Sequence, residues 1–591
     1  MRAELTRVEA DVDGARWRAA AGRGGPIPLG PLEVDLTVTG DGDIAWAVAN
    51  RGDRPVRIRS VAAVLALSGH RHGAVPLRMF RNGYQSWSPS GVATFGVDAD
   101  PSTVAGFEFL QAVHHADQRT VTAPDELRSE WVTLLAAGDG PPLLAGFDGG
   151  ASHDGTLRLR HADDGDGVEL WAEAFLGDAE LAAGASRRLH TVVLAGGPAA
   201  GATPAELLDR WATRAGRAGG ARVDAPYQLG WCSWYHYFHG VTEDAVRRNL
   251  TLADGWPFDV FQLDDGFQAA IGDWLVPNGD FPTGLPGVAG AVRSAGLRAG
   301  VWLAPFLAAP DSQVATAHPD WLARTVDGAH PLRAWWNPQW GGGGDGFHYA
   351  LDTTRPEVLA HLQALAAALV DMGFSYLKLD FTFAPAVDGR WHDPTRTPAE
   401  RVRAGYAAIR RGAGDDAFLL GCGVPLANVV GLVDGCRIGP DVAPCWALDP
   451  ADEIVAGYLG IQPATRHAWL DTAARSFMHR RLWLNDPDCL MLRTADTALS
   501  PEAARTWARA VGVSGGMALV SDDLAVLDGA ARALLDEAVA LGRASDDAAR
   551  AGRPVVAPDL LDAAHPRVLV GGGHRLHVDA ATGASTLLPA T

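Results

Sequence analysis

Lysine is almost absent from this sequence of 591 residues: it occurs once, at position 378, although the chain holds 50 lysine and arginine residues together. Arginine can replace lysine on a solvated surface, where only the positive charge matters. It is a poor replacement where a compact ammonium is needed in place of a planar guanidinium with five donors. The one lysine lies in the stretch FSYLKLDFTF, residues 374–383. It is therefore a candidate functional residue, against the alternative that it survives by chance.

An excess of positive charge is also missing. The 50 basic residues face 70 acidic ones, which gives a formal net charge of −20 at pH 7. Nucleic acids and anionic membranes are bound through basic patches, so the composition argues against both kinds of partner. It favours a neutral substrate over an anionic one. No run of about 18 apolar residues is present, so the sequence predicts no transmembrane helix.

Cysteine is scarce and scattered. The cysteines are odd in number, form no CxxC pair and lie at positions 232, 422, 436, 445 and 489. This pattern indicates reduced thiols and no zinc site. The start of the chain, MRAELTRVEADVDG, has no apolar core of a signal peptide. We therefore expect a cytoplasmic protein.

The first third of the chain has the pattern of β structure. Residues 1–200 carry short alternating runs such as LEVDLTVTG and DIAWAVAN, separated by turn residues. This predicts an N-terminal β-sandwich domain. Residues 201–225 then form a helical linker, TPAELLDRWATRAG, in which Thr203 is expected to cap the helix and Pro204 to fit its first turn.

A different rhythm follows, in which apolar runs alternate with helix-like segments over residues 226–545. Eight β-then-α units in roughly 320 residues are expected of a (β/α)8 (TIM) barrel, whose buried strands read as continuous apolar runs. A long aromatic loop at about 309–356 interrupts this rhythm, and loops of that length are usually functional or disordered. Residues 546–591 return to short strands. The predicted fold class is thus multidomain, with a central catalytic barrel between the N-terminal sandwich and a small C-terminal β-sandwich domain.

Charged residues follow several of the predicted barrel strands, where side chains face the active site of such a barrel. The second, fourth and sixth strands end with Asp264 and Asp265, Lys378 and Asp380, and Arg437 and Asp441, respectively. Each of them could also be a solvated strand end or a helix cap. We expect that blander role for Asp522 and Asp523, after the eighth strand. Asp486, after the seventh, is an alternative to Asp441.

Two of these carboxyl groups are candidates for opposite chemical roles. Lys378 and Asp380 are two residues apart on a strand, so their side chains point the same way, and the ammonium is expected to lower the pKa of Asp380. An ionised carboxylate suits a nucleophile. Asp441, near Pro444 and Trp446, is expected to keep its proton. One carboxyl low in pKa and one high is the arrangement of a retaining glycosidase, in which the two groups are about 5–5.5 Å apart.

Five motifs together resemble a known family. LDDG, LKLDF and RIGPDVAPCW occur in this order, with GWCSWYHYF on the first barrel strand and RMFRNGYQSWSPSG in the N-terminal domain. They are similar to the α-galactosidases of glycoside hydrolase family 36, and to its shorter subgroup, because an SDNTD-like motif is missing. The resemblance covers most of the chain. It implies a retaining exo-α-galactosidase that hydrolyses terminal α-D-galactosyl residues of oligosaccharides through a covalent glycosyl-enzyme, without a cofactor or metal.

The resemblance also implies a role for individual residues. Asp380 matches the nucleophile of the KxD motif, and Asp441 matches the acid/base of the RxGPD motif. Asp264 and Asp265 match the pair that holds the galactose 4- and 6-hydroxyls. The full set of expected substrate-binding residues is Asp264, Asp265, Lys378, Arg437, Trp87, Trp234, Tyr235, Trp302 and Cys422, with Trp87 reaching over from the sandwich domain.

Other functions stay open at this level. An α-N-acetylgalactosaminidase or a galactosyl-transferring relative of the same family would use the same motifs. A metal-dependent, enolase-like barrel enzyme would need a triad of acidic metal ligands, usually with Glu, and no Glu stands at the predicted strand ends. A non-catalytic sugar-binding protein would lack the nucleophile or the acid, and both positions are filled. The expected partner is a small oligosaccharide, and whether the chain forms a homo-oligomer is left open.

Overall fold

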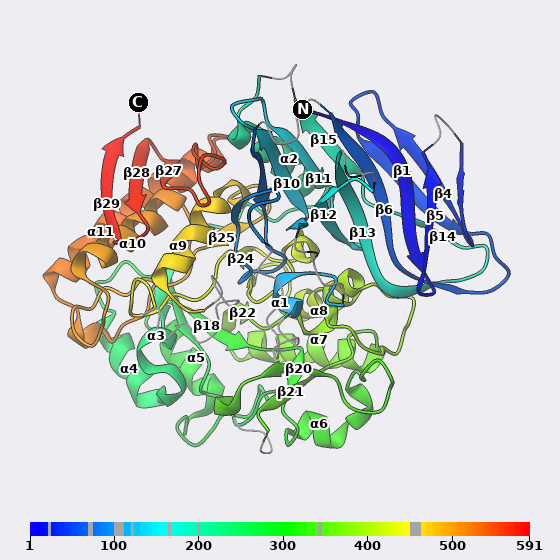
Figure 1. Cartoon of the computed structure of the whole chain (residues 1–591). Helices are drawn as coiled ribbons and strands as arrows, with labels where there is room; N and C mark the ends of the chain where they lie inside the picture. Colours follow the sequence, from blue (N-terminus) through cyan, green and yellow to red (C-terminus); the bar gives the residue numbers. More distant parts are fainter. Residues whose placement is uncertain are drawn as a thin grey trace.

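The computed structural model describes residues 1–21, 25–68, 75–99, 111–119, 123, 125–163, 165, 167–197, 201–340, 345–448 and 462–590. Figure 1 shows a β-rich N-terminal part in blue and cyan, a barrel with surrounding helices in green and yellow, and a small sheet at the C-terminus in red. The predicted fold class is confirmed. Among the described residues, no helix is both long enough and apolar enough to cross a lipid bilayer.

The N-terminal part consists of two antiparallel sheets. The first has the order β2 (Ala15–Ala20), β1 (Arg2–Val12), β6 (Val56–Ser68), β13 (Val168–Leu181), β12 (Asp154–His161) and β9 (Leu127–Glu130). The second has the order β3 (Ile27–Leu29), β4 (Leu32–Val38), β5 (Ile44–Asn50), β15 (Val192–Gly196), β11 (Leu143–Phe147), β10 (Val132–Ala137), β7 (Leu77–Arg81) and β8 (Gly91–Thr94), and β14 (Ser186–Arg188) pairs with β5. Alternate residues of strands such as β4 are buried, as expected of strands with one face in a core.

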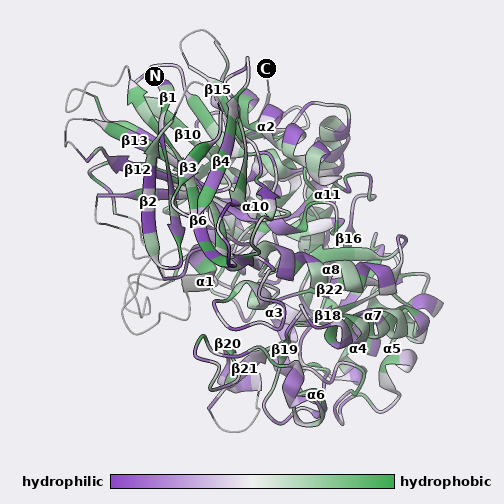
Figure 2. Cartoon of the chain, turned by 90° about the vertical axis from the view of Figure 1, so that its right-hand side faces the viewer, coloured by the Kyte–Doolittle hydropathy of each residue, from purple (hydrophilic) through white to green (hydrophobic). Residues whose placement is uncertain are grey.

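Eight parallel strands form the barrel. They are β16 (Leu229–Cys232), β17 (Val260–Leu263), β18 (Arg298–Leu303), β22 (Phe374–Leu379), β23 (Phe418–Gly421), β24 (Gly435–Arg437), β25 (Leu484–Asp486) and β26 (Ala518–Val520). The ring nearly closes, because Leu490 bridges to Val520 and the Met517 N–H donates to the Asn485 carbonyl at 2.9 Å. These strands are buried almost throughout, and Figure 2 draws part of β16 in the green of hydrophobic residues.

Helices connect and surround the strands. They are α1 (Gln111–His114), α2 (Pro204–Gly219), α3 (Trp234–Tyr237), α4 (Glu243–Leu252), α5 (Gly284–Ser294), α6 (Gln313–Ala317), α7 (Pro356–Asp371), α8 (Pro398–Ala413), α9 (Thr465–Ala474), α10 (Pro501–Ser514) and α11 (Gly529–Arg550). The predicted start of α2 is confirmed: Thr203 Oγ1 accepts from the Glu206 N–H at 3.3 Å, and Pro204 occupies the first turn. The proposed boundary between residues 545 and 546 falls inside α11.

The long aromatic loop contains structure of its own. Strands β19 (Leu307–Ala308), β21 (Phe347–Ala350) and β20 (Arg333–Trp336) form a small antiparallel sheet between β18 and α7. At the other end of the chain, β27 (Val568–Gly571), β28 (His574–Asp579) and β29 (Ala584–Pro589) form a second three-stranded sheet, which packs against α10. The first of these sheets positions aromatic side chains over the barrel, as the site geometry below demonstrates.

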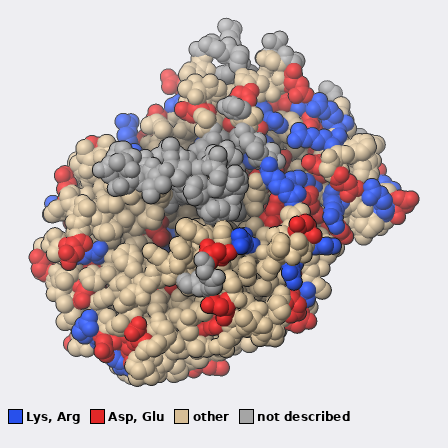
Figure 3. All heavy atoms as spheres, turned by 60° about the horizontal axis from the view of Figure 1, so that its bottom comes forward, with Lys and Arg blue, Asp and Glu red and all other residues tan. Residues whose placement is uncertain are grey.

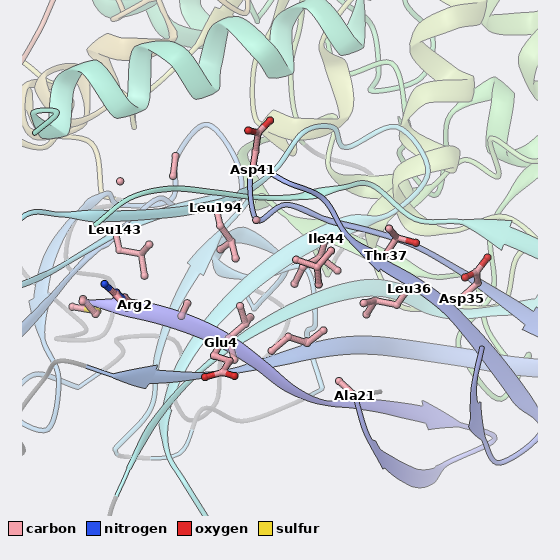
Figure 4. Close-up of a pocket in the computed structure, with 18 of the residues that line it drawn as sticks. Arg2, Glu4, Ala21, Asp35, Leu36, Thr37, Asp41, Ile44, Leu143 and Leu194 are labelled. Atoms are coloured by element: carbon pink, nitrogen blue, oxygen red, sulfur yellow. The ribbon is translucent and has the colours of Figure 1, made fainter. Parts of the chain in front are cut away.

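Two surface features complete the description. On the face shown in Figure 3, acidic and basic side chains are interspersed, and many of the basic ones lie over the sandwich. A cavity of about 980 Å³ opens between the two sheets of the sandwich (Figure 4). Its apolar wall includes Leu36, Ile44 and Leu143, and Glu4 and Asp41 add carboxyl groups. None of the residues that line it belongs to the predicted sugar site.

Candidate active site

Most of the predicted site residues meet at the carboxyl ends of the barrel strands. Asp264 directly follows β17, Asp380 directly follows β22, and Arg437 is the last residue of β24. Their exposed fractions are 2%, 7% and 2%, so these are buried charges that need partners.

The only lysine pairs with the carboxylate of another strand. Lys378 Nζ lies 3.0 Å from Asp264 Oδ2, and the same oxygen accepts from Gln262 Nε2 and from Cys232 Sγ, the latter at 3.4 Å. The Asp264 N–H donates to Ser233 Oγ at 2.9 Å. Lys378 is thus fixed on the β17 side of the site, with Asp264 as its direct ion-pair partner.

Asp380 is held through both of its oxygens. Trp302 Nε1 donates to Oδ2 at 3.0 Å, and the Phe381 N–H donates to Oδ1 at 2.8 Å. Burial raises the pKa of Asp380 above its ordinary value, while the nearby Lys378 ammonium acts to lower it. The prediction that Lys378 leaves Asp380 with a lowered pKa is therefore wrong, because the loss of hydration outweighs the attraction of the ammonium.

Aromatic rings surround the residue that follows Asp380. The centroid of the Phe381 ring lies 4.9 Å from that of Trp87, 5.0 Å from that of Trp335 and 4.8 Å from that of Trp340. The backbone of Phe381 has a φ of 52°, in the left-handed region that non-glycine residues rarely adopt. Such a conformation persists only where the surroundings enforce it, and it is common at functional sites. Trp87 joins the barrel site here, although it belongs to the sandwich.

A second buried cation organises the β24 side. Arg437 Nη1 lies 2.9 Å from Asp441 Oδ1, Nε lies 3.0 Å from Asp486 Oδ2, and Nη2 lies 2.6 Å from Asp488 Oδ1. Asp488 Oδ2 accepts from the Tyr235 hydroxyl and from the Val442 N–H. Burial raises the pKa of Asp488 to about 6. Arg437 therefore fixes the orientation of Asp441 against two further carboxyl groups.

Asp441 has different surroundings from those expected. Its side chain is 36% exposed and paired with Arg437, whereas Trp446 turns toward the C-terminal sheet and donates to the Ala580 carbonyl at 2.9 Å. The expected apolar enclosure of Asp441 by Trp446 is therefore wrong. The negative charge of Asp441 contributes, after burial and the opposing effect of Lys378, to the raised pKa of Asp380. The two carboxyl groups thus lie within electrostatic reach of each other.

Asp265 has its own set of donors. Its Oδ2 accepts from Trp340 Nε1 at 2.7 Å and lies 3.1 Å from His239 Nε2, and its Oδ1 accepts from Gln268 Nε2 at 2.6 Å. Trp234 reaches this set only through its ring contact with His239, whose centroid lies 5.1 Å away. Asp264 and Asp265 thus turn to different partners, as adjacent residues of an extended chain do.

The remaining candidates fall into place around these groups. Cys422 directly follows β23 and is completely buried, and burial raises the pKa of its thiol, with Asp380 as the next contributor. Asp523, at the same end of the barrel, accepts from the Ala525 N–H at 2.9 Å and starts a short helical turn. That is the capping role expected of it. Asp522 instead pairs with Arg493 at 2.7 Å.

Several residues that contact this site are absent from the predicted set of site residues. They are Phe381, Trp340, His239, Gln268 and Asp488. The aromatic stretch around Trp340 and the position of Asp488 after the seventh strand were the signals that pointed toward two of them. Among the described residues, no group of three or more His, Cys, Asp or Glu side chains could hold a metal ion.

Comparisons with known proteins find similarity to α-galactosidases. A family model described as Melibiase matches residues 240–390, a stretch that contains Asp264, Asp265, Lys378 and Asp380 but ends before Asp441. The α-galactosidase of Escherichia coli is 30% identical over 97 residues, which cover 15% of this chain and 14% of that protein. AgaA of Geobacillus stearothermophilus is 38% identical over 72 residues, which cover 12% of this chain and 9% of that protein. These alignments thus span small parts of the relatives.

Solved structures match over much greater lengths. The α-galactosidase TtGalA from Thermus thermophilus, solved with p-nitrophenyl α-D-galactopyranoside, has a TM-score of 0.67 and 27% identity, covering 90% of this chain and 94% of that chain. AgaA of Geobacillus stearothermophilus, a family 36 α-galactosidase, has a TM-score of 0.57 and 14% identity, covering 98% of this chain and 80% of that chain. The second match is a likeness of fold.

Proposed function

We propose that this chain, which is similar to the α-galactosidases of glycoside hydrolase family 36, is a retaining, exo-acting α-galactosidase. Its substrates are the terminal α-D-galactosyl residues of oligosaccharides. The observation that carries the proposal is the pair of carboxyl groups at two strand ends of one barrel, with Asp380 buried between two hydrogen-bond donors and Asp441 more exposed beside Arg437. A retaining glycosidase uses two such carboxyl groups, one as nucleophile and one as acid/base.

In the first half of the reaction, a carboxylate oxygen of Asp380 attacks the anomeric carbon of the galactosyl unit. The bond from that carbon to the glycosidic oxygen breaks, and Asp441 gives its proton to the departing oxygen. Trp302 and the Phe381 N–H hold the Asp380 carboxylate in position, so little reorganisation is needed at the moment of attack. The product of this half-reaction is a β-galactosyl ester of Asp380.

In the second half, Asp441 takes a proton from a water molecule, and the water oxygen attacks the same carbon. The ester bond breaks, and Asp380 leaves as a carboxylate, so the sugar keeps its α configuration. The Arg437 contact holds Asp441 in one orientation through both steps. The partial exposure of Asp441 suits a group that must meet both the leaving group and water.

Recognition of galactose is assigned to the carboxylates after β17. Asp264 with Lys378, and Asp265 with its three partners, offer charged acceptors and a donor for the axial 4-hydroxyl and the 6-hydroxyl. A site built to hydrogen-bond a hydroxyl in one position strongly rejects sugars that lack it there. The rings of Trp302, Trp340 and Phe381 supply the apolar walls.

The test is release of nitrophenol from a panel of nitrophenyl glycosides by wild type, Asp380→Ala and Asp441→Ala. We expect turnover of the α-galactoside and a loss of at least about 1,000-fold in Asp380→Ala, with azide restoring it and giving the inverted product. Preferred turnover of the N-acetyl-α-galactosaminide would instead indicate that relative's activity. Asp523→Ala is the matched control, an aspartate on the same rim that caps a turn. Wild-type turnover by Asp380→Ala would contradict the assignment.

A further inference from the structure

A loop of the sandwich brings Trp87 into the barrel site. The loop comprises residues 82–90, between β7 and β8. The Ser86 N–H donates to the Val424 carbonyl at 3.2 Å, and the Val424 N–H donates to Ser86 Oγ at 3.3 Å. One side of the loop is therefore fixed to the segment that follows β23.

A single arginine holds the other side of this loop. Arg475 directly follows α9 and is completely buried. Its guanidinium donates to the carbonyls of Ser86 and Ile438, each at 2.8 Å from Nη1, to the carbonyls of Ser88 at 2.8 Å and Gln85 at 3.2 Å from Nη2, and to Asn82 Oδ1 at 3.4 Å from Nε. Four of the acceptors belong to the loop, and the fifth follows Arg437 in the barrel.

This arrangement requires the shape of an arginine. Only a planar guanidinium carries enough donors in a fixed geometry to bond five acceptors on two domains. The loop is shaped to receive it at Gly83, where a Cβ atom would lie 2.7 Å from Arg475 Nη2. The nearest carboxylate oxygen, Asp471 Oδ2, is 3.9 Å from Nη1, so backbone carbonyls provide most of the solvation of this charge. The buried guanidinium of Arg475 therefore fixes the position of the loop.

From these contacts we infer that Arg475 is a positioning residue, which acts on the reaction by holding Trp87 against Phe381 beside the nucleophile. The inference rests on the proposed function. Trp87 sits two residues from Gln85 and next to Ser86 and Ser88, whose carbonyls Arg475 binds. Loss of the arginine frees these carbonyls, and the Trp87 ring loses its fixed place.

A second buried arginine offers a matched control. Arg480 is 5% exposed, binds Asp546 through two nitrogens at 2.6 and 2.8 Å, and donates to the carbonyls of Val223 and Ala225. These carbonyls precede β16, at the amino end of the barrel. Arg475→Lys and Arg480→Lys therefore both disturb a buried guanidinium, but only the first lies beside the Trp87 loop.

The experiment is a double-mutant cycle on nitrophenyl α-galactoside. We expect Arg475→Lys to lower kcat/KM by about 10- to 100-fold, and Trp87→Ala with Arg475→Lys to be within about twofold of Trp87→Ala alone, since residues that act as one unit are not additive. Arg480→Lys should stay within about twofold of wild type. A normal kcat/KM in Arg475→Lys, or losses that add in the double variant, would overturn the inference.

Hydrogen exchange separates this inference from the proposed function. The peptide covering residues 82–90 should exchange faster in Arg475→Lys than in wild type and should be unchanged in Arg480→Lys. If wild type hydrolyses no α-galactoside, the proposed function fails while this readout still tests the loop. Gly83→Ala is the second variant, because its Cβ would meet Ser88 and Arg475 Nη2 and so displace the loop while Arg475 itself is kept, and it should give the same two effects. Unchanged exchange in the 82–90 peptide of both variants would refute the role of Arg475.

Discussion

Buried carboxyl groups lie in two regions, the rim of the barrel and its interface with the sandwich. The two regions differ in the hydrogen-bond donors and cations that they offer to these groups. At the rim, Asp264 pairs with Lys378, and each oxygen of Asp380 accepts a hydrogen bond. At the interface, Asp154 accepts from Asn428 Nδ2 at 2.8 Å and Asp471 accepts from the Ser90 N–H at 2.6 Å.

The two regions differ most clearly in the hydrogen bonding of the second carboxyl oxygen. Oδ2 of Asp154 and Oδ2 of Asp471 are buried without a hydrogen-bond partner among the described residues. Burial raises the pKa of each of these two groups to about 7. The rim supplies donors or cations to its carboxyl groups, whereas the interface leaves Asp154 and Asp471 about half protonated near pH 7. The surroundings, and not burial alone, thus distinguish the carboxyl groups of the rim from those of the interface.

The largest expected effect is a loss of activity when the ion pair at the rim is changed. In Lys378→Arg the charge is kept but the compact ammonium is lost, and the guanidinium does not fit the 3.0 Å contact with Asp264 in a site where Lys378 is 5% exposed. We expect a loss of at least about 100-fold in kcat/KM, because a shift of about 1 Å in a group that positions substrate can cost about that much. The measurement is nitrophenol release.

Lys378→Met is the comparison variant for this test, because it removes the charge and keeps the apolar stem. Similar losses in Lys378→Arg and Lys378→Met would mean that the shape of the cation matters as much as its charge. An Arg variant within about tenfold of wild type would contradict the reading of the single lysine as irreplaceable.

The next effect is a shift in the pKa of Asp380. Trp302→Phe removes the Nε1 donor to Oδ2, a contact that lowers the pKa of Asp380 against the effect of burial. The pKa of Asp380 should therefore rise further, and the acid limb of the kcat/KM profile should move to higher pH by about one unit, since a hydrogen bond to a charged group contributes about 1.5–3 kcal/mol. Activity at low pH should fall more than activity at pH 8.

A neighbouring tryptophan provides the control. Trp231 is also buried in a barrel strand, but its Nε1 donates to the Asp522 carbonyl at 2.8 Å. Trp231→Phe should lower thermal stability without moving the acid limb. Identical pH profiles of wild type and Trp302→Phe would show that the hydrogen bond from Trp302 does not set the ionisation of Asp380.

The sequence identifies much of this site but not its pairings. Lys378 and Asp380 could be predicted as site residues, because their two-residue spacing on a strand and their place at its end are local features of the sequence. The true partner of Lys378 is Asp264, which comes from another strand, and no local pattern encodes that contact. The direction of the pKa shift of Asp380 was missed for the same reason, because burial is produced by the whole barrel.

Contacts from inserted or distant segments were the least predictable. Trp340 reaches Asp265 only because the stretch between β18 and α7 folds into a small sheet. Arg475 lies in no recognisable motif, and its five acceptors come from two domains. The barrel itself could be predicted, since the alternation of buried strands and amphipathic helices produces a recognisable hydrophobic pattern in the sequence.

The remaining expected effect concerns the stability of the interface and has the opposite sign. The folded protein keeps the Asp154 proton up to about pH 7, whereas an unfolded chain releases it near pH 4. The native state therefore binds more protons between these values, and the free energy of unfolding falls as pH rises through them. Asp154→Asn keeps an acceptor for Asn428 and removes this loss, which amounts to at most about 4 kcal/mol.

Thermal unfolding of Asp154→Asn should accordingly show a gain in midpoint that grows from pH 4 to pH 8. Asp264→Asn, at the rim, should lower the midpoint, because it leaves the Lys378 ammonium buried without its anionic partner. The two variants make the same chemical change, so a difference in sign isolates the surroundings as the cause. A midpoint for Asp154→Asn that falls at pH 8 would mean that the ionised carboxylate is stabilised there, and the contrast between rim and interface would not hold.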